Sequence, residues 1–188
     1  MINMPVPFDT DCEETRFQYS VSIVLEHEGG LSSDKRDPGG ITKWGISLRY
    51  LRVIGLDINH DGSINSEDIL AIDQQKAIAI YREYWWDKYD YNKLISIEVA
   101  AKIFDMSVNM GSNTAHKLLQ ISINRLQEIP IKVDGFLGCN TLKAANSFFG
   151  SLLRQELREC AEHHYLEIIA DNPSLACFKN GWLNRATW

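Results

Sequence analysis

The chain has 188 residues, of which 45% are hydrophobic and 23% are charged, a balance typical of one globular domain and not of a disordered chain. The formal net charge of −6 disfavours nucleic acid as a partner, because binding to phosphate groups requires clustered lysine and arginine side chains. Residues 1–10 lack the basic and apolar segments of a secretory signal, and no run of 18 apolar residues is present. We expect a monomer without a membrane span, made in the cytoplasm, that reaches any outside target after lysis or by specialised export.

Helical periodicity dominates the chain. Apolar side chains at helical spacing over residues 13–27 predict an amphipathic helix that ends at Glu28, Gly29 and Gly30. Residues 29–45 contain five glycines and a proline, which predicts a loop or a short hairpin. Further helices are predicted from Ser66 through Trp85, over residues 96–110, 114–127, 141–149 and 152–170, and near Trp182, with a turn over residues 130–138. The expected class is mainly α with at most a small β-hairpin, in a single domain spanning 1–188.

The cysteines give no sign of a metal site. Cys12, Cys139, Cys160 and Cys177 are widely spaced and form no C-x-x-C pair, which argues against zinc. A chain made in the cytoplasm is expected to keep its thiols free, and we expect most of them to be buried.

Two carboxyl side chains near the N-terminal helix form a candidate active site. Glu28 ends the predicted helix beside two glycines, and a carboxyl that the core partly shields tends to keep its proton. Asp37 follows nine residues later and Thr42 five residues after that. One protonated and one ionised carboxyl on either side of a bond is the arrangement that glycoside hydrolysis uses. On spacing alone the pattern is weak, because Asp37 also begins a natural turn sequence.

Longer stretches of sequence resemble a known family. The runs 25–30 (LEHEGG) and 37–46 (DPGGITKWGI) are similar to the N-terminal signature of glycoside hydrolase family 108, the bacterial and phage N-acetylmuramidases. Later blocks of that family are resembled by residues 80–85 and 104–111, its peptidoglycan-binding segment by 134–142, and its C-terminal end by 181–185.

The resemblance implies a lysozyme-like α fold and cleavage between N-acetylmuramic acid and N-acetylglucosamine. It divides the single domain into a catalytic segment at about residues 18–95 and a helical peptidoglycan-binding segment at about 96–188. The order Glu28, Asp37, Thr42 is also similar to the Glu-x8-Asp-x5-Thr triad of phage-type lysozymes, although the second interval is one residue shorter here. Leu31 stands where the family usually has an aromatic residue.

These residues predict a mechanism. Glu28 is expected to protonate the glycosidic oxygen, and Asp37 to stabilise the transition state or to activate water that Thr42 helps to hold. A separation of the two carboxyls of roughly 6.5–9.5 Å would indicate inversion of the sugar configuration, and about 5 Å retention. The expected substrate contacts are Gly29, Gly30, Trp44, Tyr81 and Asn109, although Tyr81 also fits the alternative of a core aromatic residue.

Residues 57–68 (DINHDGSINSED) have the spacing of a calcium-binding loop. Oxygen-bearing side chains occupy positions one, three, five, nine and twelve, and a glycine stands at position six, where an EF-hand loop turns sharply. The position-twelve residue is Asp instead of the usual Glu. The expected Ca²⁺ ligands are Asp57, Asn59, Asp61, the carbonyl of Ser63, Asn65 and Asp68.

Two other functions stay open at this point. A lytic transglycosylase also uses one glutamate but leaves an anhydro product, and the presence of Asp37 favours hydrolysis over it. The second alternative is a non-catalytic, calcium-dependent wall-binding module. The expected partner in each case is peptidoglycan, and the biological setting is either a phage endolysin released through a holin or a secreted effector with an immunity protein.

Overall fold

The computed structural model describes residues 12–28, 31–32 and 41–188. Within these ranges the fold is mainly helical, with one small sheet. The elements in chain order are α1 (Glu13–Glu28), β1 (Leu31–Ser32), β2 (Thr42–Lys43), β3 (Ile46–Ser47), α2 (Leu48–Ile54), α3 (Ser66–Ala71), α4 (Gln74–Tyr81), the π-helical turn η1 (Arg82–Asp87), the 3-10 turn η2 (Tyr91–Lys93), α5 (Ile97–Met110), α6 (Ser112–Leu126), α7 (Cys139–Ala145), α8 (Gly150–Asp171), the 3-10 turn η3 (Pro173–Phe178) and α9 (Lys179–Thr187).

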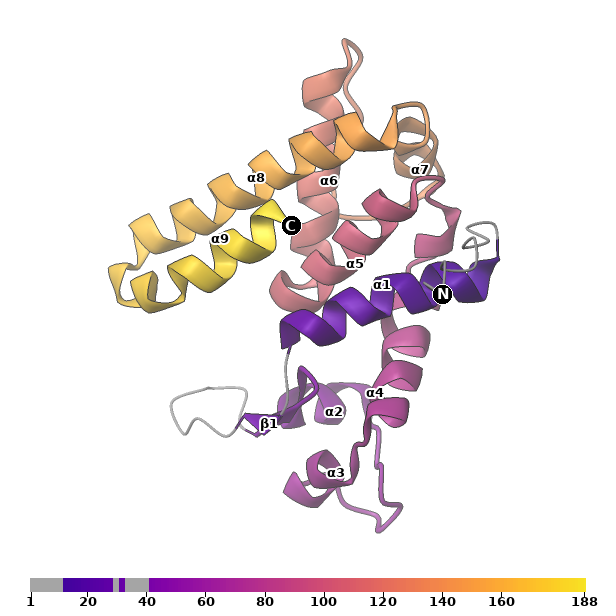
Figure 1. Ribbon diagram of the computed structural model, residues 1–188, viewed down its shortest axis with the longest axis vertical. Coiled ribbons are helices and arrows are strands. Elements are labelled where there is room, and N and C mark those ends of the chain that lie inside the picture. Colours follow the sequence, from indigo (N-terminus) through magenta and orange to yellow (C-terminus); the bar gives the residue numbers. More distant parts are fainter. Residues whose placement is uncertain (1–11, 29–30, 33–40) are drawn as a thin grey trace, which may run out of the picture.

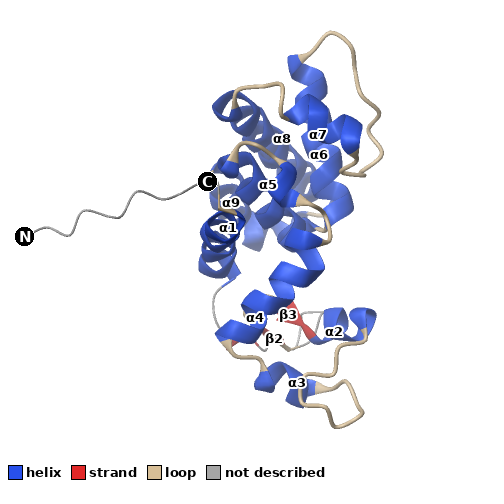
Figure 2. Ribbon diagram, turned by 90° about the vertical axis from the view of Figure 1, so that its right-hand side faces the viewer, coloured by secondary structure: helices blue, strands red, loops and turns tan. Residues whose placement is uncertain are grey.

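Helix α5 is the centre of the molecule. It packs against α1, α6 and α8, and the strands with α2 and α3 lie at the opposite end of the long axis from α6 and α7 (Figures 1 and 2). Nine consecutive residues of α5, Val99 to Ser107, are buried. A helix that is surrounded on every side loses the usual exposed polar face, so its charged residues Lys102 and Asp105 are buried with the rest.

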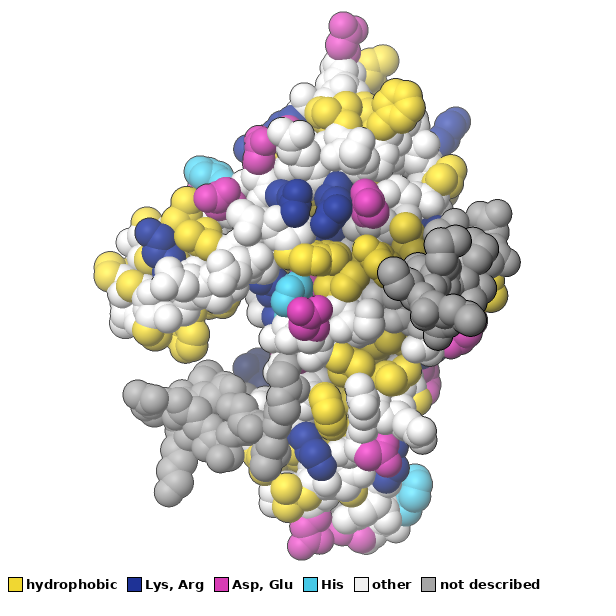
Figure 3. Space-filling view, in the orientation of Figure 1, with side chains coloured by type: hydrophobic (Ala, Val, Ile, Leu, Met, Phe, Trp, Pro, Cys, Tyr) yellow, Lys and Arg dark blue, Asp and Glu magenta, His cyan; other side chains and the backbone are white. Residues whose placement is uncertain are grey.

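Helices α8 and α9, joined by η3, form an arm that projects to one side of this core (Figure 1). The arm brings the last helix of the chain back toward α5 and α1. In the space-filling view the surface is hollowed beneath the arm, on the side where α1 ends (Figure 3).

Local sequence signals set several of the helix ends. The side chain of Ser96 accepts a hydrogen bond from the Val99 amide and begins α5. Asn65 and Asp68 form a capping box at the start of α3. Gly55 ends α2 with φ of +68°, a left-handed conformation that glycine adopts without strain.

The sheet is a three-stranded antiparallel meander in the order β1-β2-β3. Leu31 pairs with Lys43, and Lys43 in turn pairs with Ile46. The link between β2 and β3 has only two residues, and φ is +54° at Trp44 and +75° at Gly45. Positive φ at both central residues is what a two-residue hairpin turn with the native strand twist requires.

The predicted helices over 13–27, 96–110 and 114–127 are confirmed by α1, α5 and α6. The helix predicted from Ser66 is wrong in its continuity, because Asp73 caps a new helix and divides the segment into α3, α4 and η1. Helix α2 was not predicted. It has only seven residues, and only Leu51 is fully buried, so its apolar pattern is too short to identify a helix.

The cysteines differ from expectation in one respect. Cys139, Cys160 and Cys177 are free thiols, but of the four cysteines only Cys160 is buried. Cys160 lies on the inner face of α8, whereas Cys139 begins the short helix α7 and Cys177 lies in η3 on the arm. The prediction of mostly buried thiols is therefore wrong.

No helix in the described part of the chain has the length and apolar character needed to cross a membrane.

Candidate active site

Glu28 is the last residue of α1, and its carboxylate meets an arginine from the far end of the chain. Arg185 Nη2 donates a hydrogen bond of 2.7 Å to Glu28 Oε1. The Glu28 side chain keeps 18% of its surface exposed, whereas that of Arg185 keeps 9%. The carboxylate therefore sits at a boundary, held from the protein side and reachable from solvent.

Asp105 is the main counter-ion of Arg185. Asp105 on α5 accepts hydrogen bonds from Arg185 Nε at 3.1 Å to both carboxylate oxygens and from Nη2 at 2.8 Å. Burial lowers the pKa of the arginine, but the carboxylates of Asp105 and Glu28 outweigh it and raise the pKa above its ordinary value. The guanidinium is thus a permanent cation shared between two carboxylates.

His27 completes the surroundings of Asp105. Its Nδ1 lies 2.9 Å from Asp105 Oδ1, and its ring packs edge-on against Trp188. Burial raises the pKa of Asp105, but hydrogen bonds from His27 and Arg185 and the charge of Arg185 bring it below the ordinary range. Asp105 is therefore ionised, as a counter-ion to Arg185 must be.

Lys102 anchors the helix that carries Arg185. Its fully buried Nζ donates hydrogen bonds to the carbonyls of Arg185 at 2.6 Å and Ala186 at 2.9 Å. A cation is well placed there, because the last carbonyls of a helix lack partners and carry partial negative charge. Burial lowers the pKa of Lys102 to about 7, against the opposing effect of Asp105.

Gly45 lets the backbone of the β2–β3 turn approach the Glu28 carboxylate. A Cβ at Gly45 would lie 2.6 Å from Glu28 Cγ and Oε2 and from the hydroxyl oxygen of Tyr81. The buried Tyr81 hydroxyl donates a hydrogen bond of 2.8 Å to the carbonyl of Trp44 and so fixes the turn. Tyr81 is therefore a core aromatic residue whose polar end reaches the edge of the site.

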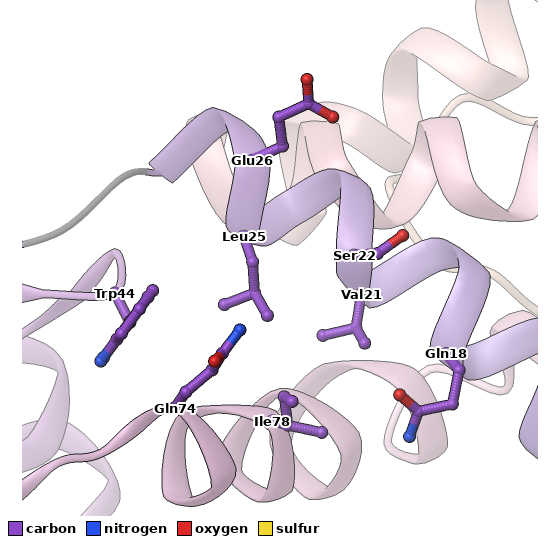
Figure 4. A pocket seen from close by; sticks show the side chains of 8 residues that line it. All are labelled: Gln18, Val21, Ser22, Leu25, Glu26, Trp44, Gln74 and Ile78. Atoms are coloured by element: carbon purple, nitrogen blue, oxygen red, sulfur yellow. The ribbon is translucent and has the colours of Figure 1, made fainter.

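The predicted site residues fall in different places. Asp37, Gly29 and Gly30 lie outside the described residues. Thr42 lies on β2, where it pairs with Ser32 and Ser47. Trp44 lines a hollow of about 360 Å³ between α1 and α4, near Leu25 and Gln74 (Figure 4).

Asn109 lies near the end of α5, on the arm side of the site. Its exposed side chain accepts a hydrogen bond of 2.7 Å from the Tyr165 hydroxyl of α8. The Tyr165 ring stacks on Trp182 of α9, which stacks in turn on Phe178. Trp182 and Arg185 are three residues apart on one helix face, so the aromatic column holds the arm in the position from which Arg185 reaches Glu28.

The sequence analysis did not assign Asp105, His27 or Arg185 to the site. All three lie within the sequence blocks that carry the resemblance to the family, 25–30, 104–111 and 181–185. A charged residue inside the strongly apolar run of α5 was the one available signal for Asp105, since such a residue needs a buried partner. Nothing in the sequence identifies that partner as a residue 80 positions away.

The predicted calcium loop has an ordered backbone. Asp57 Oδ2 accepts from the Gly62 amide at 2.8 Å, and Asp61 Oδ1 accepts from the Ser63 amide at 2.8 Å. Asp68 is fully buried and accepts from the amides of Ile58 and Asn65. Among the described residues, no three His, Cys, Asp or Glu side chains converge closely enough to form a metal cluster. All the predicted side-chain donors are nevertheless oxygens, which suits Ca²⁺.

Comparison with known proteins agrees with this arrangement. The profile described as glycosyl hydrolase 108 matches residues 21–111, and one described as a predicted peptidoglycan domain matches residues 114–187. The structure of SagA from Brucella abortus superposes with a TM-score of 0.74 and 25% sequence identity, over 93% of this chain and 91% of that chain. The comparison with curated proteins gives no match.

The fold and these matches identify a glycoside hydrolase that acts on peptidoglycan. Residues 21–111 match the glycosyl hydrolase 108 family and residues 114–187 the peptidoglycan domain, as the sequence blocks predicted.

A methyl group at Gly45 tests the close approach to Glu28. We expect Gly45→Ala to lower peptidoglycan hydrolysis at least about 100-fold, because its Cβ collides with the carboxylate and misplaces it. Gly55→Ala is the matched control, since Gly55 also has positive φ but has nothing within 4 Å of a Cβ. Both variants carry a backbone cost of about 1 kcal/mol. Equal activity losses in the two variants, measured by release of soluble wall fragments, would contradict the assignment.

The buried Lys102 predicts a pH dependence of stability. The pKa of Lys102 is about 7 in the folded protein and 10.5 without burial, so between these values the unfolded chain binds more protons. Folding is therefore increasingly favoured as the pH rises from 7, by up to about 1.4 kcal/mol per pH unit. Urea unfolding of the wild type at pH 7 and 9 should show this rise, and Lys102→Met should lack it. The exposed Lys179→Met should keep the wild-type rise.

Proposed function

We propose that the chain is an N-acetylmuramidase that cleaves the β-1,4 bond between N-acetylmuramic acid and N-acetylglucosamine in peptidoglycan. The observation that carries the proposal is the Glu28 carboxyl, exposed on one side and held on the other by the buried Arg185–Asp105 pair. A hydrolase needs one carboxyl positioned to protonate the leaving oxygen, and no other described carboxyl is held in this way.

The hydrogen-bond pattern assigns different tasks to the two oxygens of Glu28. An arginine side chain can only donate hydrogen bonds. Because Glu28 Oε1 accepts a hydrogen bond from Arg185, a proton on Oε1 could not point toward the guanidinium. The proton that Glu28 delivers is therefore carried on Oε2, the oxygen next to Gly45. The absence of a side chain at Gly45 lets the turn lie against that oxygen without a steric collision.

Asp105 is the main counter-ion of Arg185, and Glu28 is its second partner. Asp105 receives three hydrogen bonds from Arg185, whereas Glu28 receives one. When Glu28 has transferred its proton to the glycosidic oxygen, the bond from Arg185 stabilises the carboxylate that remains. A preformed donor of this kind requires no rearrangement during the reaction.

The second group of the reaction is proposed on sequence grounds. Asp37 would stabilise the oxocarbenium-like transition state or activate the attacking water, and Thr42 would help to hold that water. Trp44, Gly29, Gly30 and Asn109 are proposed to contact the glycan. Support for Asn109 comes from its exposed position at the arm side of the site, where its amide can pair with an N-acetyl group.

Product analysis tests the activity and the acid together. Wild-type protein and Glu28→Gln are incubated with purified peptidoglycan, and the soluble fragments are identified by mass spectrometry. We expect fragments with reducing N-acetylmuramic acid ends from the wild type and a loss of at least about 1,000-fold for Glu28→Gln, because the amide cannot donate the required proton. Glu83→Gln, an exposed carboxyl in η1, should act as the wild type does.

Each other result points to a different function. Anhydro ends would identify a lytic transglycosylase that uses the same glutamate. Fragments that persist undiminished in Glu28→Gln would remove Glu28 from the mechanism. An absence of fragments from wild-type protein, with calcium present, would leave the wall-binding module as the better account.

We also propose that the loop 57–68 binds Ca²⁺ and thereby stabilises the lobe beside the active site. The ligands would be Asp57, Asn59, Asp61, the Ser63 carbonyl, Asn65 and Asp68. Support comes from the twelve-residue spacing and from the backbone hydrogen bonds that already hold Asp57 and Asp61 in place. The role of the ion is structural, since the loop contributes no group to the Glu28 network.

Thermal unfolding with Ca²⁺ or with a chelator tests this site. At a Ca²⁺ concentration of about 100 times Kd, binding to the folded state adds about 2.7 kcal/mol and raises Tm. Asp61→Asn removes one proposed carboxylate ligand and should weaken this shift. Glu67→Gln, at loop position eleven, removes the same charge without removing a ligand and should preserve it. The same Tm with Ca²⁺ and with chelator would show that the loop binds no calcium.

A further inference from the structure

Three aromatic side chains, Tyr50, Trp85 and Tyr89, lie together between the helical core and the small lobe formed by β1–β3, α2 and α3. Tyr50 belongs to α2, which lies with the strands at one end of the molecule (Figures 1 and 2), and Trp85 belongs to η1. The ring centroids of Tyr50 and Trp85 are 4.4 Å apart. Burial, together with the nearby hydroxyl of Tyr89, raises the pKa of Tyr50. These three residues, the inter-lobe aromatic cluster, therefore join a helix of the lobe to the core.

The cluster is packed on one side and open on the other. Tyr50, Trp85 and Tyr89 are partly exposed, whereas the residue after Trp85, Trp86, is fully buried. In the described part of the chain, the Tyr50 hydroxyl and the Trp85 N–H have no hydrogen-bond partner, and neither group is sealed from solvent. The polar ends of Tyr and Trp usually find a partner inside a protein, so these two are available to a ligand.

The backbone that carries Trp85 departs from regular helix geometry. Helix α4 does not continue past Tyr81, because residues Arg82–Asp87 form the π-helical turn η1. The turn is fixed in shape, since Arg82 Nε at its start donates to both carboxylate oxygens of Asp87 at its end, at 3.2 and 3.3 Å. Turns of this kind are rare and occur frequently at functional sites. The geometry of η1 therefore indicates that Trp85 serves binding as well as packing.

The cluster begins one side chain away from Glu28. The ring centroids of Tyr81 and Trp85 are 5.4 Å apart. The Tyr81 hydroxyl and Glu28 Oε2 both lie against Gly45, since a Cβ there would be 2.6 Å from each oxygen. Only the buried Tyr81 ring thus separates the cluster from the carboxyl proposed as the acid.

The far side of the cluster reaches the end of α5. Ser112 donates a hydrogen bond of 2.8 Å to the Tyr89 hydroxyl, and it follows the proposed glycan contact Asn109 by three residues. Gly111 stands between them, exposed, and nothing lies within 4 Å of the position that its Cβ would take. A polymer that contacts Asn109 and the cluster can therefore pass Gly111 without meeting a side chain.

We propose that the inter-lobe aromatic cluster is a sugar-binding subsite of the active site, where Tyr50 and Trp85 hold one amino sugar of the glycan strand beside the bond that Glu28 protonates. The inference rests on the proposed function, because it takes Glu28 as the acid. Aromatic rings pack against the apolar face of a sugar, and an open hydroxyl and N–H suit its hydroxyl and N-acetyl oxygens. Binding at a distance from the reacting bond holds the strand in register for proton transfer. The cluster lies within residues 21–111 and outside the region matched by the predicted peptidoglycan domain.

Packing between the lobe and the core is the alternative role for Tyr50, and one substitution separates the two roles. Tyr50→Leu keeps an apolar side chain between the lobe and Trp85 but removes the flat ring and the hydroxyl. A ring that only fills space is replaced by leucine at little cost, whereas a sugar-binding surface is lost.

Calorimetric binding of a soluble tetrasaccharide of alternating N-acetylglucosamine and N-acetylmuramic acid tests the proposal. All proteins carry Glu28→Gln so that the sugar is not cleaved, and folding is checked by Tm. We expect Tyr50→Leu to raise Kd about tenfold, and Tyr50→Phe, which keeps the ring, to stay within about threefold of the parent. Tyr19→Leu replaces a partly exposed tyrosine of α1 outside the cluster and should bind as the parent does.

Hydrolysis of soluble glycan strands gives a second measurement. With Glu28 intact, Tyr50→Leu should raise KM more than it lowers kcat, whereas a displaced lobe would mainly lower kcat through the Gly45 turn.

Equal Kd values for the parent and Tyr50→Leu would overturn the inference, and so would a parent that does not bind the tetrasaccharide. Failure of this inference is distinguishable from failure of the proposed function. Tyr50-dependent binding in a protein whose wild type releases no wall fragments would support the subsite and reject the hydrolase. Release of fragments by the wild type, with a Kd that Tyr50→Leu leaves unchanged, would support the hydrolase and reject the subsite.

Discussion

The proposed active centre depends on one shared cation. Arg185 is hydrogen-bonded at once to the buried Asp105 and to Glu28 at the edge of the core. These three residues come from α9, α5 and α1, so the network forms only when the first, middle and last helices of the described chain meet. Charges cost several kcal/mol to bury unless they are paired, and a pair of this kind adds little to net stability. The effect of the network is to fix the relative positions of α1, α5 and α9, because displacing any of these helices would leave a buried charge without its partner.

Other parts of the fold support that position from different sides. Lys102 holds the carbonyls at the end of α9, and the column of Tyr165, Trp182 and Phe178 holds the arm. The two-residue turn at Trp44 and Gly45 closes over the carboxylate, with the Tyr81 hydroxyl fixing its carbonyl. Apolar packing around α5 stabilises the domain, and these polar contacts fix the position of Glu28.

The overall charge gives the enzyme little help in reaching its substrate. A chain of net charge −6 gains no long-range attraction from an anionic wall polymer. Short-range contacts must then supply the affinity.

The sequence by itself determined the helical class, the bounds of α1, α5 and α6, and the family, because helical periodicity and local motifs are properties of neighbouring residues. It also placed a glutamate at the end of α1, beside glycines. It did not reveal α2, with one buried residue, or the break at Asp73, where a capping side chain overrides the apolar pattern. The tertiary structure alone decided that Arg185 lies against Glu28, 157 residues away, and that Asp105 neutralises it. An ion pair of that kind depends on how separate helices pack against one another. The apolar periodicity of a single segment carries no information about that packing.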